Sequence, residues 1–138
     1  MTEPSFFLIV VATILQFVLG ALWYSPLLFG KWWMQIMECD SLSKDELKSM
    51  QKKMMPFYFV QLALTFFTTF SLSNFMYYGS RLGFYHTAFW IWIGFMAPVS
   101  VASVIWANTK QKFWAKQILI MLTNQLAGIM LTAYILSM

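Results

Sequence analysis

The chain has 138 residues, of which 60% are hydrophobic and 10% are charged, and its formal net charge at pH 7 is +4. A soluble domain normally carries about 25% charged residues, so this composition indicates an integral membrane protein. The basic residues lie in loops beside apolar tracts and form no separate basic groove, so they fit anionic lipid and we expect no nucleic-acid partner.

The apolar sequence falls into four charge-free tracts, at residues 4–30, 54–80, 82–109 and 117–138. Each is longer than the roughly 20 residues that an α-helix needs to cross a bilayer. Only structures that pair every backbone group span a membrane, and helices do so within one segment. We therefore expect an all-α, single-domain membrane protein, with four transmembrane helices in an antiparallel bundle. Their expected bounds are about 5–29, 56–78, 85–108 and 113–137.

The basic residues also indicate how the chain crosses the membrane. Eight of the nine lie after the first tract or after the third, and only Arg81 lies on the other side. By the positive-inside rule both basic loops are cytoplasmic and both termini lie outside. Cys39 then falls in a cytoplasmic loop, where a lone thiol is expected to stay reduced.

The first expected helix carries one polar side chain at mid-membrane depth, Gln16, between Ala12 and Gly20 on a strip of four-residue spacing. Such a strip is typical of close helix packing, with the amide bonded to a neighbouring helix. A contact to a ligand or a pore is the alternative. Aromatic and basic residues follow where the apolar tract ends, as expected at a headgroup boundary. The expected interface anchors are Trp23, Tyr24, Lys31, Trp32, Trp33, Trp106 and Trp114.

A short helix is expected over about 44–54, in the first basic loop. Ser43 and Glu46 have the spacing of a capping box. One face carries Leu47, Met50 and Met54, and another carries Lys44, Lys48 and Lys52. This amphipathic pattern predicts either a helix on the cytoplasmic membrane surface, with its lysines on anionic headgroups, or a solvated connector. Pro56 is expected to separate it from the second transmembrane helix.

The later helices supply the remaining candidate residues. Amides at similar depth suggest a shared central polar network of Gln16, Gln61, Asn124 and Gln125, with coincidence as the alternative. The expected kink and packing positions are Gly20, Pro26, Gly94, Pro98 and Gly128. A weak parallel 2+2 repeat is also suggested, because glycine, proline, a basic loop and tryptophan follow one another in both halves.

Two motifs resemble a known family. They are GALWYSPLLFGKWW at residues 20–33 and WIGFMAP at residues 92–98. Together with the capped polar helix, they resemble the bacterial membrane family called Domain of Unknown Function 1761 over nearly the whole chain. The resemblance implies four membrane helices in a bacterial inner membrane, and it implies no reaction or ligand.

Three classes of function are compatible with these features. The first is a binding or transport module for a small neutral or lipid-like molecule, favoured by the mid-membrane amides. The second is an accessory subunit that packs against a membrane partner or a further copy of the chain. An intramembrane enzyme ranks last, because no Asp, Glu, Lys, Arg or His lies in a helix core and acid–base catalysis needs a titratable group. We expect no metal and no cofactor.

Overall fold

The computed structural model describes residues 4–79 and 81–138, which form helices, turns and loops and no strand. The α-helices are α1 (Phe6–Trp23), α2 (Gly30–Ile36), α3 (Lys44–Asn74), α4 (Phe84–Ile91), α5 (Ala97–Trp106) and α6 (Trp114–Leu136). Two π-helical segments, η1 (Phe75–Gly79) and η2 (Trp92–Met96), and a 3-10 turn, η3 (Gln111–Phe113), join them. Four segments of the described chain are long and apolar enough to cross a membrane: Phe6–Trp23, Lys44–Gly79, Phe84–Trp106 and Gln111–Leu136. The prediction of an all-helical chain with four helices able to cross a membrane is therefore confirmed, and the antiparallel bundle stays a prediction.

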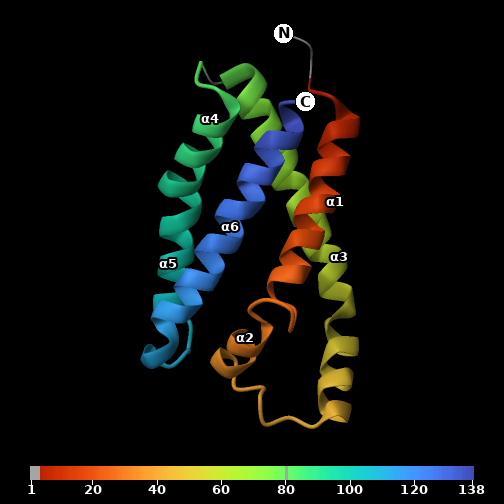
Figure 1. Cartoon of the computed structure of the whole chain (residues 1–138), viewed down its shortest axis with the longest axis vertical. Helices are drawn as coiled ribbons and strands as arrows, with labels where there is room; N and C mark the ends of the chain where they lie inside the picture. Colours follow the sequence, from red (N-terminus) through yellow and green to blue (C-terminus); the bar gives the residue numbers. More distant parts are fainter. Residues whose placement is uncertain (1–3, 80) are drawn as a thin grey trace.

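Helix α6 is central in the arrangement (Figure 1). It packs against α1 on one side and against α4, η2 and α5 on the other, and α1 also packs against α3. The start of α1 and the end of α6 lie at the same end of the molecule. A buried apolar cluster consists of Ile9, Leu72, Met76, Ala88, Ile129, Ala133 and Leu136.

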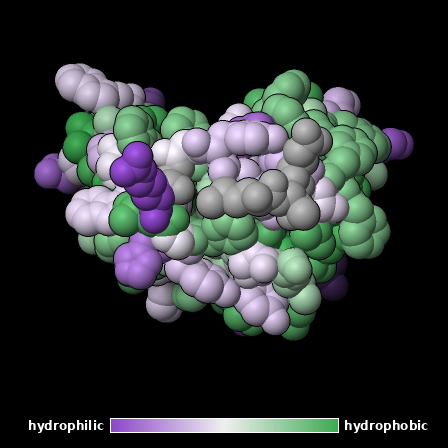
Figure 2. Space-filling view, turned by 90° about the horizontal axis from the view of Figure 1, so that it is seen from above, coloured by the Kyte–Doolittle hydropathy of each residue, from purple (hydrophilic) through white to green (hydrophobic). Residues whose placement is uncertain are grey.

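Large apolar side chains also point outward. Phe, Leu, Ile and Met residues are exposed along the first three spanning segments, whereas between Gln111 and Leu136 the exposed large apolar residues are Leu119 and Tyr134. Viewed from the end that carries both termini, the surface is mainly hydrophobic or weakly polar, with few strongly hydrophilic residues (Figure 2). In water, the apolar side chains exposed along the spanning segments would be a liability, whereas hydrocarbon is a suitable solvent for them.

The first helix is shorter than predicted. Helix α1 ends at Trp23, not near residue 29, and a tight turn leads into α2, which the sequence did not predict. The Ser25 hydroxyl donates to the Leu22 carbonyl at 2.6 Å, and the Gly30 amide donates to the Ser25 carbonyl at 2.8 Å. Pro26 disfavours the α conformation of Ser25, the residue before it, and so favours the end of the helix here.

The prediction of two helices separated at Pro56 is wrong. Residues 44–74 form one continuous helix, α3, with Pro56 inside it. The capping box at its start is confirmed: the Ser43 amide donates to Glu46 Oε2 at 2.8 Å and the Glu46 amide donates to Ser43 Oγ at 3.3 Å. An internal proline costs about 3 kcal/mol. Strong helix formers such as Leu, Lys, Glu, Gln and Met fill the turns before it and favour the helix.

The third and fourth spans agree with the sequence within two residues. The third extends from Phe84 to Trp106, and its regular α-helix is interrupted by η2 just before Pro98. Pro98 has no amide hydrogen, so the hydrogen-bond ladder has to change near it. Pro26 lies in a turn whereas Pro98 lies in a helix, so these two positions differ structurally and the repeat stays a prediction.

An ion pair joins the two basic loops at the end opposite the termini. Lys110 Nζ lies 2.5 Å from Glu38 Oε1. The hydrogen bond and the charge of Lys110 lower the pKa of the Glu38 carboxyl, and the carboxylate raises the pKa of Lys110. Both side chains are exposed, so this pair positions the loops and adds little to stability.

Candidate functional site

The polar residues between α1 and α6 form the candidate site. Each helix contributes residues at four-residue spacing, which places them on one face of that helix. We call this set the α1–α6 seam: Gln16 and Gly20 on α1 with Tyr24 directly after its end, and Asn124, Gly128 and Thr132 on α6. Gln16 meets Thr132 at one end of the seam, and the Tyr24 and Asn124 side chains interact at the other. Gly20 therefore lies between these two contacts.

Gln16 connects three helices. Its Oε1 accepts a hydrogen bond from Thr132 Oγ1 at 2.9 Å and a longer one from Thr69 Oγ1, on α3, at 3.4 Å. Both threonines have no exposed surface. Gly128 supplies the room, because a Cβ there would lie 3.3 Å from Gln16 Cγ and 3.4 Å from Gln16 Nε2. The amide oxygen thus has two partners and the close approach depends on one glycine.

The nitrogen Nε2 is the other end of the Gln16 amide. In the described part of the chain no protein acceptor bonds Gln16 Nε2. An unmade hydrogen bond away from water costs about 1–3 kcal/mol. One turn further along α1, a Cβ added to Gly20 would meet no described atom within 4 Å. The seam therefore combines a free N–H donor with open space on the same helix face.

The predicted central network is divided between different neighbours. Gln125 lies against α5, where its Nε2 donates to Ser100 Oγ at 2.6 Å. Gln61 is exposed on α3 and bonds only Thr65, on its own helix, at 3.5 Å. No hydrogen bond joins Gln16 to Asn124 among the described residues. The four amides all lie in segments that are long and apolar enough to cross a membrane, but they do not form one cluster.

Three buried polar atoms have no partner among residues 4–79 and 81–138: Trp92 Nε1, Gln117 Oε1 and Gln125 Oε1. Trp92 lies in η2, which packs against α6, and the two glutamines lie on α6 itself. Gln117 is only 5% exposed. The sequence analysis did not select Trp92 or Gln117, although the position of Gln117 at the start of an apolar tract was a usable signal.

The expected packing glycines behave differently from one another. Gly128 contacts Gln16, whereas added Cβ atoms at Gly20 and Gly94 would meet no described atom within 4 Å. In the described part of this single chain, no other helix therefore packs closely against Gly20 or Gly94. Gly30, which the sequence analysis did not select, is the tightest glycine, because its Cβ would lie 2.5 Å from the Ser25 carbonyl carbon.

The expected anchors gather where α1, α2 and α6 meet. The Trp23 indole donates to the Ile120 carbonyl at 3.1 Å, which ties the end of α1 to α6. The Tyr24 and Trp33 rings lie 4.8 Å apart, and Lys116 Nζ lies 5.4 Å from the Trp32 ring. The remaining anchors are Trp114, whose indole donates to the Thr109 carbonyl, and Lys31 and Trp106, which are exposed.

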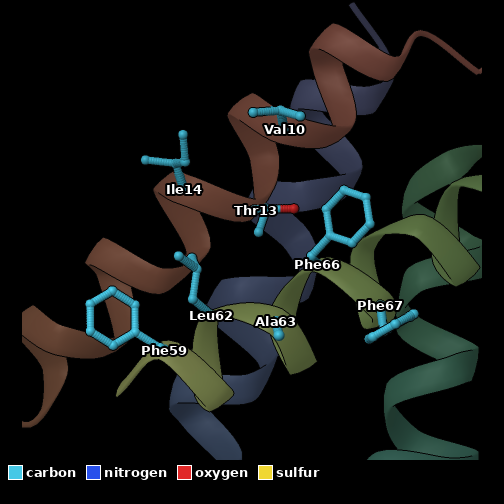
Figure 3. Close-up of a pocket in the computed structure, with 8 residues that line it drawn as sticks. All are labelled: Val10, Thr13, Ile14, Phe59, Leu62, Ala63, Phe66 and Phe67. Atoms are coloured by element: carbon cyan, nitrogen blue, oxygen red, sulfur yellow. The ribbon is translucent and has the colours of Figure 1, made fainter. Parts of the chain in front are cut away.

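An apolar groove lies between α1 and α3, away from the seam (Figure 3). Its volume is about 410 Å³, and it is lined by Val10, Thr13, Ile14, Phe59, Leu62, Ala63, Phe66 and Phe67. The Thr13 hydroxyl already donates to the Ile9 carbonyl at 2.7 Å. The groove thus suits hydrocarbon and offers no free hydrogen-bonding group.

Comparison with known proteins gives one match. The model of the family described as "Protein of unknown function (DUF1761)" matches residues 7–137, which is nearly the whole chain. No curated protein and no solved structure matches it. The match assigns no activity.

Proposed function

The chain belongs to the family Protein of unknown function (DUF1761), and on the geometry of its α1–α6 seam we propose that it binds a small neutral or lipid-like molecule inside the membrane. The observation that carries this proposal is the free Gln16 Nε2 beside the open space at Gly20. In hydrocarbon no water is present to satisfy that donor. A ligand with an uncharged acceptor oxygen, such as a carbonyl, an ester or a hydroxyl, supplies the missing bond.

The charge distribution supports an uncharged ligand. Apart from His86, near the start of the third span, no Asp, Glu, Lys, Arg or His lies in the charge-free tracts, so an ion in the seam would have no counter-charge. The same lack of a general acid or base places an enzyme last among the candidates. Transport would require a path through the membrane. Side chains fill the centre of a four-helix chain, so a single copy favours binding, and transport would need several copies to assemble.

Replacing Gln16 by leucine tests the proposal. Interhelical hydrogen bonds in membranes are worth about 0.6 kcal/mol on average, so the fold should be only slightly weakened. Ligand retention should fall at least tenfold, measured by mass spectrometry of small molecules that copurify in mild detergent. Gln61→Leu is the matched control, because it removes an exposed amide that bonds only its own helix, and it should retain the ligand. Equal retention by both variants, or no retained molecule in the wild type, would contradict the proposal.

An accessory subunit is the second candidate. Gln61 is exposed on the side of α3 that faces away from the other helices, and a lipid-facing amide is unfavourable. A second protein or a further copy of this chain would bury it. A stoichiometric partner that copurifies while no small molecule is retained would favour this function.

We further propose that the chain lies in a bacterial inner membrane with both termini outside. The support is the position of the basic loops at the end opposite the termini. An impermeant maleimide should then label Cys39 only after cells are opened. An Arg81→Cys variant that lacks Cys39 is the control, and it should react in intact spheroplasts. The reverse pattern would invert the orientation of every helix.

A further inference from the structure

The first part of α3 is too long and too polar to lie in the bilayer core. At 1.5 Å per residue, the 31 residues of α3 extend for about 46 Å, against a core of about 30 Å. The charge-free part of α3 begins at Met54. About ten residues at its start therefore project beyond the core. We call residues 44–55 the α3 arm.

Basic residues flank an apolar stripe on the arm. Successive residues are about 100° apart around a helix, so Leu47, Met50 and Met54 share one face. Lys44, Lys48 and Lys52 lie on one side of this stripe and Lys53 lies on the other. All of these side chains are exposed except Leu47, which is half-buried. In the part of the chain that the structure describes, none of the arm lysines has an ion-pair partner.

The arm joins the span at a weak point in the helix. Pro56 has no amide hydrogen, so the Lys52 carbonyl, four residues earlier, lacks its usual donor. Bending a helix here breaks one hydrogen bond fewer than elsewhere, and proline is a common site of sharp kinks. Met55 and Pro56 stand at the boundary between the charged arm and the apolar span.

We propose that the arm bends at residues 52–56 and binds an anionic phospholipid surface. The apolar stripe then enters the boundary between headgroups and acyl chains, and the lysines on both sides reach lipid phosphates. Asp45 lies on the face opposite the stripe and points to water. Charge complementarity and the position of the lysines directly beside a span favour lipid over an acidic protein. This inference does not depend on a ligand in the α1–α6 seam.

Quenching in nanodiscs tests the arm directly. A bimane label is placed on the stripe with Met50→Cys, or away from it with Ser49→Cys, both in a Cys39→Ser background. The quencher is attached to the lipid headgroup. In low salt, the label at 50 should be quenched in phosphatidylcholine that contains phosphatidylglycerol and not in phosphatidylcholine alone. The label at 49 should be less quenched, and high salt should release the arm.

Three variants separate the effect of the arm lysines from the effect of the hinge. Lys44→Gln/Lys48→Gln/Lys52→Gln should shift the balance between bound and free arm about a hundredfold, since each lysine near an anionic surface contributes about a fivefold change. Lys31→Gln/Lys112→Gln/Lys116→Gln removes the same net charge outside the arm and should leave the quenching unchanged. Pro56→Ala should restore a regular helix and reduce the quenching.

Other results would overturn the inference. Equal quenching in the two lipid mixtures would show apolar insertion without recognition of anionic lipid. No quenching in either mixture would show an upright arm and leave an acidic protein as its partner. An equal effect of the two triple variants would refute a specific role of the arm lysines, and unchanged quenching in Pro56→Ala would refute the hinge.

Discussion

Replacing Gly30 by alanine is expected to destabilise the protein by about 3 kcal/mol, because overpacking against backbone forces the chain to move. A Cβ at this position would lie 2.5 Å from the Ser25 carbonyl carbon, 2.6 Å from its oxygen and 2.8 Å from the Tyr24 carbonyl oxygen. No side-chain rotation can relieve contacts with backbone atoms. The turn would open, and the bond between the Gly30 amide and the Ser25 carbonyl would be lost.

Thermal unfolding in detergent measures this effect, with Gly20→Ala as the control. Gly20 is inside α1 and an added Cβ meets no described atom within 4 Å. Alanine there should leave the protein unchanged or stabilise it by about 0.5–1 kcal/mol, because alanine favours a helix. A Gly30→Ala protein as stable as Gly20→Ala would show that the turn does not determine how α1 ends.

Gly128→Leu is expected to separate α1 from α6 and to cost about 2–3 kcal/mol. A Cβ alone would lie 3.3 Å from Gln16 Cγ, so a leucine has to displace the glutamine side chain. Gln16 Oε1 would then lose both threonine donors, at 2.9 and 3.4 Å. Gly128→Ala should fall between wild type and Gly128→Leu, because the shift it requires is only a few tenths of an ångström.

The matched control is Gly94→Leu, at an exposed glycine with no described atom within 4 Å of an added Cβ. The unfolding temperature measures stability, and the labelling rate of a cysteine placed at Gly20 measures opening of the seam. Gly128→Leu should lower the unfolding temperature and raise the labelling rate, whereas Gly94→Leu should change neither. Equal behaviour of the two variants would mean that Gln16 does not hold the helices together.

The spans and the capping box could be predicted because their signals are local. Continuous apolar tracts fix the spans, and the three-residue spacing of Ser43 and Glu46 fixes the start of α3. The helix break predicted at Pro56 is wrong, because the cost of a proline inside a helix is outweighed here by the helix-forming residues before it. Helix α2 was missed because its tryptophans fit a membrane interface equally well.

The partners of the amides could not be predicted in the same way. The depth of an amide along its helix follows from its position in the sequence, but its hydrogen-bond partner depends on how that helix is rotated against its neighbours. Asn124 and Gln125 are adjacent, so they point about 100° apart, one to the end of α1 and the other to α5. From the sequence, the hydroxyls of Thr69 and Thr132 would be expected to bond carbonyls of their own helices. Only the assembled structure shows that both donate to Gln16.

The short first helix affects the bilayer itself. The 18 residues of α1 extend for about 27 Å, a few ångströms less than a typical hydrocarbon core of about 30 Å. The bond from Trp23 to Ile120 holds the end of α1 to α6, so α1 cannot slide to share the deficit. The resulting hydrophobic mismatch has to be met by the lipids, which thin beside α1 at a cost of a fraction of a kcal/mol per ångström. Thinner regions of a membrane would therefore accumulate this protein.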